Sequence, residues 1–513
     1  MKRYNLFYAL FILTNSLMAQ AKFQEQYRPQ FHFSPETMWM NDPNGMVYYE
    51  GEYHLFYQHY PYNKVWGPMY WGHAVSRDLV QWEHLPIALD PDSLGYIFSG
   101  SAVVDINNTS GFKTGMNAPL VAMFTYHDMA GEKAGRNNYQ YQGIAYSNDK
   151  GRTWTKYRGN PVIPNTEGVK DFRDTKVFWH EPSKRWIVVF AVADHVRFYS
   201  SKNLKEWTLT GDFGKNQGAH GGVWECPDIF PLKVEGTKTT KWVLLQSLGN
   251  GAPNGGSGTQ YFIGDFDGKT FINSNTPEKV LWLDYGRDNY AGVTWANAPQ
   301  NRRIFLGWMS NWQYAQVVPT DPWRSAMTLP RELSLKKTPQ GLRLIQKPAK
   351  ETEILRGVNF FSKKNITVDN TLKINDLSQF LCEVQMDIDL TKSTAKDVYI
   401  ELSNGKGDIY KIGFDVATNR YYSDRTKAGK NDFSEKFSPT IHYAPRQSSS
   451  KKLKMHLFFD KASVELFADN GETVLTDIFF PNEDFVQMRL IANGGKVLIT
   501  DMTAFALGSV YAH

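Results

Sequence analysis

Short apolar runs of strand length, separated by turn-forming residues, recur along almost the whole chain. Residues 53–58 and 186–192 are two such runs, and a sustained helical period of about 3.6 residues is almost absent. Glu50-Gly51 and Pro182-Ser183 each separate a pair of runs, as tight turns do between antiparallel strands. Frequent Gly, Pro and Asn and an aromatic content of 14% agree with this pattern. It predicts an all-β protein with few helices.

A weak internal repeat runs through the first two thirds of the chain. A Ser-containing turn is followed by a tryptophan three times, at residues 76–82, 147–154 and 200–207. Repetition at intervals of roughly 50 to 70 residues predicts propeller blades with insertions. The candidate innermost strands number five, and they begin near Gly45, Gly100, Thr175, Asp228 and Ala291. We therefore expect residues 22–335 to form a five-bladed β-propeller that carries the catalytic site.

Past about Leu335 the pattern changes. A segment containing Lys and Pro, residues 336–356, is interpreted as a linker. Alternating runs follow at 398–402, 453–459 and 462–467, and they predict a β-sandwich over residues 357–513. A chain of this length is expected to hold two domains. We expect the second domain to pack against the propeller, with sugar binding as the less favoured alternative.

The first 21 residues resemble a secretory signal peptide. Lys2 and Arg3 precede an apolar run over residues 6–18, which ends in Ala19-Gln20-Ala21. The alternative, a membrane anchor, is disfavoured because the run is shorter than the ~20 residues that span a bilayer. We expect a cleaved signal peptide over residues 1–21 and export of the mature chain to the periplasm or the extracellular space.

The net charge disfavours a nucleic-acid-binding protein. Removing Lys2 and Arg3 with the signal peptide lowers the formal net charge from +5 to +3 on a chain with 52 acidic residues. Cys226 and Cys382 are the only cysteines, and their spacing fits no disulfide framework, so we expect two unpaired thiols.

A carboxylate lies among polar and aromatic residues in three separate stretches. These are Trp39-Met40-Asn41-Asp42-Pro43-Asn44-Gly45, Phe172-Arg173-Asp174-Thr175 and Trp224-Glu225-Cys226-Pro227-Asp228. Each of Asp42, Asp174 and Glu225 lies at or just before a predicted inner strand. Because inner strands line one axial channel, we expect the three acids to meet in one pocket. Such a set fits glycosidic-bond cleavage; the alternative is that they are unrelated turn residues.

The three stretches together resemble glycoside hydrolase family 32, whose members cleave β-fructosides such as sucrose, inulin and levan. The first stretch matches the family pattern over all seven residues, and Glu225-Cys226 matches its Glu-Cys element. Thr175 departs from the family, which has proline after the Arg-Asp pair. Further matching stretches are Phe56-Tyr57-Gln58-His59, Phe98-Ser99-Gly100-Ser101 and Gly307-Trp308-Met309.

The resemblance implies a role for each candidate residue. Asp42 would be the nucleophile, Glu225 the general acid and base, and Asp174 the carboxylate that binds fructose hydroxyls. Arg173 would bind hydroxyls or stay paired with a carboxylate, and Asp288 and Tyr290 would join the pocket from the fifth blade. No cofactor or metal is implied. The other substrate-binding residues would be Asn41, Gln58, Trp66, Phe98, Ser99 and Trp312.

The resulting hypothesis is an exported retaining β-fructosidase that releases fructose from levan or inulin, with sucrose as a further substrate. A fructosyltransferase would use the same residues, because acceptor choice depends on pocket shape. A non-catalytic fructan-binding protein would have lost a working carboxylate, and all three are present. A five-bladed propeller can also carry arabinan-type hydrolysis, but the intact stretch over residues 39–45 disfavours it.

Overall fold

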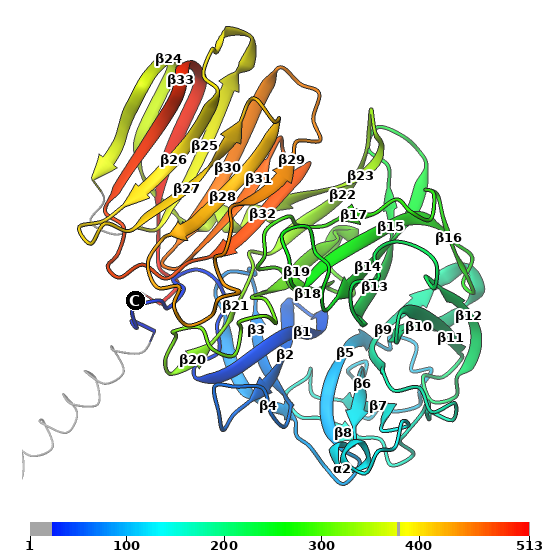
Figure 1. The fold of residues 1–513 in the computed structure, drawn as a ribbon. Helices are drawn as coiled ribbons and strands as arrows, with labels where there is room; N and C mark the ends of the chain where they lie inside the picture. Colours follow the sequence, from blue (N-terminus) through cyan, green and yellow to red (C-terminus); the bar gives the residue numbers. More distant parts are fainter. Residues whose placement is uncertain (1–22, 377–379, 512–513) are drawn as a thin grey trace, which may run out of the picture.

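The computed structural model describes residues 23–376 and 380–511, so the predicted signal peptide lies outside the described residues. The chain forms a five-bladed β-propeller followed by a β-sandwich, which confirms the predicted fold (Figure 1). Within the described residues the one α-helix is α2 (Met129–Lys133), and no helix there is long and apolar enough to cross a membrane.

The first three blades each contain strands in chain order. Blade 1 comprises β1 (Met38–Tyr49), β2 (Glu52–Tyr60), β3 (Tyr70–Ser76) and β4 (Glu83–Leu89), with β20 (Trp323–Arg324) added beside β1. Blade 2 comprises β5 (Tyr96–Val104), β6 (Leu120–His127), β7 (Gln140–Ser147) and β8 (Thr155–Lys156). Blade 3 comprises β9 (Phe172–His180), β10 (Arg185–Val192), β11 (His195–Ser201) and β12 (Thr208–Phe213).

The last two blades complete the ring. Blade 4 comprises β13 (Trp224–Lys233), β14 (Thr240–Leu248), β15 (Gly258–Phe266), β16 (Phe271–Asn273) and β17 (Leu281–Trp282). Blade 5 comprises β18 (Tyr290–Thr294), β19 (Ile304–Met309), β21 (Ala326–Met327), β22 (Arg331–Thr338) and β23 (Gly341–Pro348). β20, in the segment that follows β19, pairs in parallel with β1, with Met38 opposite Trp323. This pairing joins blade 5 to blade 1 and closes the ring.

The five innermost strands are β1, β5, β9, β13 and β18, and each contains one of the predicted starting points. The tryptophans of the repeat occupy equivalent places in the first three blades. In each turn between the third and fourth strands, the indole N–H donates to a backbone carbonyl three residues earlier, as Trp82 does to Leu79, Trp154 to Gly151 and Trp207 to Leu204. The repeat in the sequence is therefore a repeated turn between outer strands.

Residues 336–356, interpreted as a linker, mostly belong to blade 5. β22 pairs with β23 in register from Arg331 opposite Pro348 to Thr338 opposite Gly341, and the 3-10 turn Lys350–Leu355 follows. The lysines and proline suggested a linker, whereas Leu344 of this segment is buried with Leu333 and Leu335 of β22 in a cluster that includes residues of blade 4. The boundary between the domains therefore lies after β23.

The sandwich is one continuous sheet that folds over itself. Its strands are β24 (Arg356–Asp376), β25 (Cys382–Asp389), β26 (Asp397–Ser403), β27 (Ile409–Asp415), β28 (Arg420–Lys427), β29 (His442–Pro445), β30 (Lys452–Asp460), β31 (Ser463–Ala468), β32 (Thr473–Ile478) and β33 (Gln487–Leu507). The first part of β33 pairs with β26 and the later part with β25, so β33 passes from one layer to the other.

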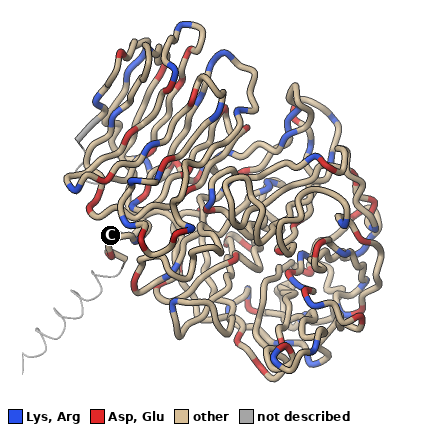
Figure 2. Tube along the Cα trace, in the orientation of Figure 1, with Lys and Arg blue, Asp and Glu red and all other residues tan. Residues whose placement is uncertain are grey.

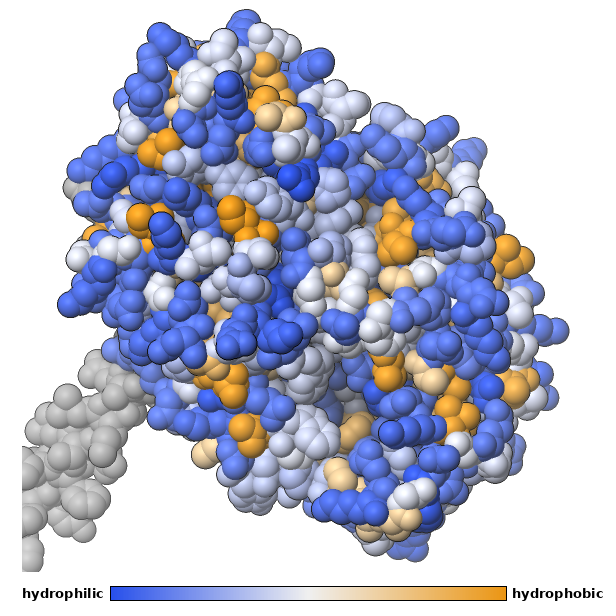
Figure 3. All heavy atoms as spheres, viewed as in Figure 1, coloured by the Kyte–Doolittle hydropathy of each residue, from blue (hydrophilic) through white to orange (hydrophobic). Residues whose placement is uncertain are grey.

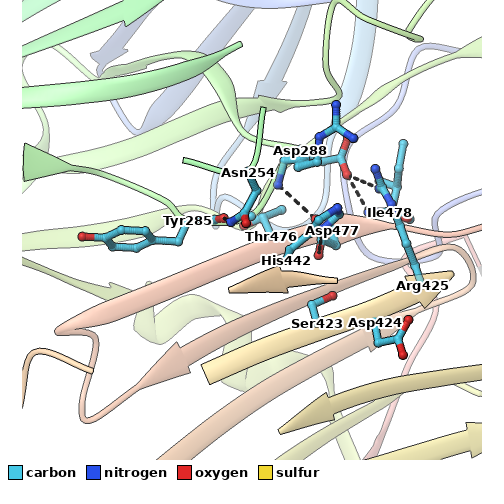
Figure 4. A network of polar contacts seen from close by, with 12 residues as sticks. Asn254, Tyr285, Asp288, Ser423, Asp424, Arg425, His442, Thr476, Asp477 and Ile478 are labelled. Carbon is cyan, nitrogen blue, oxygen red and sulfur yellow. Dashed lines mark hydrogen bonds and ion pairs between the residues drawn. The ribbon is translucent and has the colours of Figure 1, made fainter. Parts of the chain in front are cut away.

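Buried charges fix the sandwich against the propeller. Arg331 of blade 5 is fully buried and binds Asp284 and Glu465 at 3.0 and 2.6 Å. Arg425 of β28 reaches Asp288 at 2.7 Å (Figure 4). Asp477 of β32, which pairs with His442 inside the sandwich at 2.8 Å, accepts from the backbone N–H of Arg287 in the propeller at 3.0 Å. Breaking one such pair leaves an unpaired buried charge, so these contacts specify a single arrangement of the domains.

The surface carries both signs of charge over both domains (Figure 2). The face drawn in Figure 3 is mostly hydrophilic, with small separate hydrophobic groups.

Candidate active site

The three predicted acids come together at one end of the inner strands. Asp42 lies on β1, Asp174 on β9 and Glu225 on β13. Cys226 connects them, because its backbone N–H donates to Oδ2 of Asp174 at 3.1 Å and its Sγ lies 3.4 Å from Oδ2 of Asp42. Asp42 and Asp174 are 8% and 5% exposed, so the pocket withdraws both carboxylates from water.

A β-bulge interrupts each of the five inner strands near this pocket. In β1 the register with the second strand of the blade shifts twice, between Met40 and Pro43, where Asp42 lies, and between Asn44 and Val47. The other inner strands each shift once, at Ile97–Gly100, at Arg173–Lys176, at Glu225–Asp228 and at Tyr290–Val293. Three bulged residues, Asp174, Cys226 and Ala291, have positive φ angles of 69°, 47° and 53°. Non-glycine residues rarely adopt this conformation, and bulges often redirect side chains next to active sites. The bulges thus turn the acids into the axial pocket.

Gly45 lies in the register shift of β1 between Asn44 and Val47, and its surroundings show why glycine is required there. Its φ is 53°, and a Cβ atom there would lie 2.5 Å from Cδ2 of Phe56 and 2.8 Å from Cζ3 of Trp71. Both the backbone angle and the close aromatic rings exclude a side chain. Gly45 therefore allows β1 to bend behind Asp42.

Asp42 is held by hydrogen bonds to both of its oxygens. Oδ2 accepts from Ser99 Oγ at 2.7 Å, and Oδ1 accepts from Asn41 Nδ2 at 2.9 Å. Asn41 is itself oriented by the indole N–H of Trp39 at 2.7 Å. Burial raises the pKa of Asp42, the bond from Ser99 lowers it, and the charge of Glu225 raises it. The donors around Asp42 therefore favour the ionised form in a site that otherwise opposes it.

Asp174 shares the pocket with a cation. Its pKa is raised to about 7, because burial and the charges of Glu225 and Asp42 together outweigh the lowering effect of the Arg173 guanidinium. Its backbone N–H donates to Thr125 Oγ1 at 3.0 Å, which fixes the bulged residue. The Arg173 guanidinium therefore partly offsets the cost of burying the Asp174 carboxylate.

Glu225 lies between a cation and a phenol. Arg173 Nη2 donates to Oε1 of Glu225 at 2.9 Å, and the Tyr290 hydroxyl donates to Oε2. Arg173 also donates to Asp171 at 2.6 Å, so of the two predicted options it is paired with carboxylates. The Glu225 side chain is 21% exposed, more than those of the two aspartates. Hydrogen bonds to both carboxyl oxygens thus hold the Glu225 side chain in place, and it remains partly accessible from the pocket.

Thr175 occupies the place where the family has proline. It is buried, and its hydroxyl donates to the carbonyl of Met123 on the neighbouring blade at 2.8 Å. Asp174 beside it keeps its bond from Cys226. The threonine therefore adds a bond between blades and leaves Asp174 within the pocket.

The predicted substrate-binding residues surround the acids at different depths. Gln58 is buried, and its amide donates to the carbonyl of Ile97 at 3.0 Å. Trp66 is half-buried against the edge of Phe98, with ring centroids 6.0 Å apart. Half-buried Trp312 packs on Trp39 and Trp308. Trp66 thus packs on Phe98, whereas Trp312 belongs to a cluster with Trp39, whose indole orients Asn41.

One expected neighbour lies elsewhere. Asp288 is fully buried in the domain interface, where it accepts from Tyr314 at 2.6 Å and pairs with Arg425, whereas Tyr290 from the same blade reaches Glu225.

The sequence analysis did not predict Asp171 and Thr125 as part of the site, although the closeness of Asp171 to Arg173 in the sequence could have indicated the first of them. Among the described residues, no group of three or more His, Cys, Asp or Glu side chains is arranged to hold a metal ion.

Comparison with known sequences identifies both domains. The model of the glycosyl hydrolases family 32 N-terminal domain matches residues 32–348, and that of the family 32 C-terminal domain matches residues 351–506. A levanase of Bacillus subtilis (strain 168) is 50% identical over 511 residues, which cover 98% of this chain and 74% of that protein. A levanase of Bacillus sp. (strain L7) is 39% identical, and the chain spans 53% of its length.

A fungal relative matches at nearly full length. The extracellular exo-inulinase of Aspergillus awamori is 39% identical over 505 residues, which cover 92% of this chain and 93% of that protein. The crystal structure of exo-inulinase from the same organism superposes with a TM-score of 0.88 at 37% identity, covering 95% of this chain and 99% of that one. Both domains and their arrangement are therefore shared with this structure.

Proposed function

The chain belongs to glycoside hydrolase family 32, and from this we propose that it is an exported β-fructosidase that hydrolyses fructans of the levan or inulin type. The arrangement that carries the proposal is Asp42, bound by Ser99 and Asn41, facing the same pocket as Glu225, bound by Arg173 and Tyr290. Two carboxyl groups in distinct surroundings are what a retaining glycosidase needs. The relatives named levanase and exo-inulinase support fructan as the substrate.

In the first step, a carboxylate oxygen of Asp42 attacks the anomeric carbon of a terminal fructofuranosyl unit. The bond from that carbon to the leaving oxygen breaks, and protonated Glu225 gives its proton to the leaving oxygen. The product is a covalent fructosyl-enzyme ester and a shortened fructan. Ser99 and Asn41 assist because their bonds favour the ionised nucleophile.

In the second step, Glu225 acts as a base. It takes a proton from water, the water oxygen attacks the anomeric carbon, and the ester bond to Asp42 breaks. Fructose leaves with net retention of configuration, and both carboxyl groups return to their first states. Asp174 would bind ring hydroxyls more strongly as positive charge builds on the sugar, which stabilises the transition state.

Release of fructose by the purified mature chain from levan, inulin and sucrose tests the proposal. Asp42→Asn and Glu225→Gln should each lose about 10³-fold or more of kcat while retaining fold, because each removes a group of a joint mechanism. Ser423→Ala, a change in the sandwich core, is the matched control. Hydrolysis that survives Asp42→Asn would contradict the assigned nucleophile.

Two competing assignments give different products. A fructosyltransferase would lengthen sugars at high sucrose concentration, whereas a hydrolase releases free fructose under the same conditions. The hydrolase names of the relatives disfavour transfer as the main activity. A non-catalytic binding protein would retain fructan and release nothing.

Export is part of the proposal. The N-terminal pattern and the extracellular exo-inulinase relative support it. N-terminal sequencing of the protein recovered from the periplasm and from the medium would locate the cleavage site and distinguish the two compartments. Uncleaved protein found only inside the cell would contradict export.

A further inference from the structure

Three tyrosines form a row across the outer face of the sandwich. Tyr399 on β26 pairs with Gly413 on β27, Gly413 pairs with Tyr422 on β28, and Tyr422 pairs with Tyr443 on β29. Because directly paired residues project from the same face of a sheet, the three rings lie on one side. The ring centroids are 6.4 Å apart between Tyr399 and Tyr422 and 6.3 Å apart between Tyr422 and Tyr443.

This face points away from the sandwich core. The residues next to the tyrosines in each strand, Ile400, Ile412, Tyr421 and Ala444, belong to the buried cluster between the layers. Tyr399 and Tyr443 are partly exposed, whereas Tyr422 between them is 7% exposed. Gly413 lies between Tyr399 and Tyr422 and has no side chain to separate them. A Cβ at this position would lie 2.4 Å from Cβ of Tyr399. The glycine thus allows the rings of Tyr399 and Tyr422 to approach each other on the outer face of the sheet.

Charged side chains of both signs border the tyrosine row. Lys411 Nζ lies 5.1 Å from the ring centroid of Tyr399, and the Arg420 guanidinium lies 4.1 Å from that of Tyr443. Asp397 accepts from the Tyr422 hydroxyl at 3.0 Å. A cavity of about 380 Å³ lies over the row, within the range of small-ligand sites. The balance of charge fits a neutral ligand with many hydroxyl groups better than an anion or a cation.

One end of the row is tied to the rim of the catalytic pocket. Asn254 accepts from the backbone N–H of Tyr443 at 3.0 Å, and its amide donates to the carbonyl of Tyr443 at 3.0 Å. The same amide donates to the carbonyl of Tyr285 at 2.6 Å, and Figure 4 shows Asn254 beside Tyr285. Asn254 lies in the loop 249–257 between β14 and β15. That loop begins beside the general acid, because a Cβ at Gly249 would lie 3.9 Å from Oε2 of Glu225.

We propose that the tyrosine row, Tyr399, Tyr422 and Tyr443, is a second, non-catalytic binding site for fructan chains. This inference rests on the proposed function for its ligand. Aromatic faces would pack on the apolar faces of fructosyl units while the bordering Lys, Arg and Asp side chains bind their hydroxyls. The site would hold a polymer near the catalytic pocket and thereby raise its local concentration there.

Binding is tested in the Glu225→Gln protein, in which the ligand is not consumed. Migration is measured in native gels containing levan, with sucrose added to saturate the catalytic pocket. The Tyr422→Ala/Tyr443→Ala double variant should weaken retention about tenfold, as loss of a strong contact does. Tyr443→Trp should retain binding because it keeps an aromatic face. Ile272→Ala, at a 66% exposed residue of blade 4, is the control.

Kinetics of the active enzyme provide a second measurement. The double variant should raise KM for levan several-fold while leaving kcat/KM for sucrose unchanged, since sucrose is too short to reach both sites. Equal retention by the double variant and the parent protein would overturn the proposal, as would equal losses on levan and sucrose. Failure of the proposed function would give a different result from failure of this binding site. The active enzyme would then release no fructose from levan or sucrose, regardless of the binding measured in the gels.

Discussion

Arg173 and Glu225 form a contact across two blades, with Nη2 donating to Oε1 at 2.9 Å. The guanidinium also pairs with Asp171 on its own blade. We therefore propose that Arg173 fixes the group assigned as acid and base. Its positive charge opposes the rise in pKa that burial causes at Asp174.

Replacing Arg173 separates positioning from substrate binding. Arg173→Gln should lower kcat on sucrose by about 10²-fold or more, because a preorganised charge next to the reacting groups is lost. The pKa of Asp174 should rise without the cation, so the acid limb of the pH–rate profile should move to higher pH. Steady-state kinetics from pH 4 to 8 would measure both effects.

The control for this variant is Arg152→Gln, which breaks a pair with Glu52 on the surface. Its pH profile should match that of the unchanged enzyme, since such pairs contribute little. A rise in KM with unchanged kcat in Arg173→Gln would instead assign Arg173 to substrate binding alone.

Ser99 controls the ionisation of Asp42. Its hydroxyl donates to Oδ2 at 2.7 Å and lowers the pKa of that carboxyl against the effect of burial. In Ser99→Ala the pKa of Asp42 should therefore rise further, and kcat/KM should fall most at low pH. The acid limb of its pH profile should move upward, and a fall that is the same at every pH would contradict this role.

Thr175 should contribute to stability more than to catalysis. Thr175→Val keeps the shape but removes the donor to the carbonyl of Met123, which should lower the free energy of unfolding by about 1 kcal/mol. Activity on sucrose should stay close to that of the unchanged enzyme. Urea unfolding and initial rates would test this, and a large loss of kcat with unchanged stability would make Thr175 a positioning residue for Asp174.

His32 should make stability depend on pH. Burial disfavours its charged form, but hydrogen bonds to Asp460 and Glu465 at 2.7 and 2.9 Å outweigh this and raise its pKa to about 9. A pKa raised above the unfolded value of 6.5 stabilises the fold fully below pH 6.5, and that stabilisation is lost as the pH rises through about 9.

Comparison of unfolding free energies from pH 6 to 10 would test this effect. The unchanged protein should exceed His32→Gln by the largest margin at pH 6, and the margin should shrink toward pH 10. His220→Gln, at an exposed histidine on blade 4, serves as the control. A margin that stays constant across the range would contradict the raised pKa of His32.

The sequence by itself determined the class of fold and the identity of the acids. Runs of strand length and the repeated tryptophan turns specify blades, because side-chain pattern and turn chemistry act locally. The stretch from Trp39 to Gly45 and the Glu225-Cys226 pair marked, through the family resemblance, the groups proposed to react. The interpretation of 336–356 as a linker failed where burial of leucines against another blade decided the structure.

The tertiary structure decided how these parts meet. The bulges that aim Asp42, Asp174 and Glu225, the pairing of Arg173 with Glu225 and the burial of Asp288 against Arg425 all join segments far apart in sequence. The tyrosine row likewise exists only because four strands pair in one register. Register, burial and charge pairing depend on neighbours that folding brings together, so no local pattern could specify them.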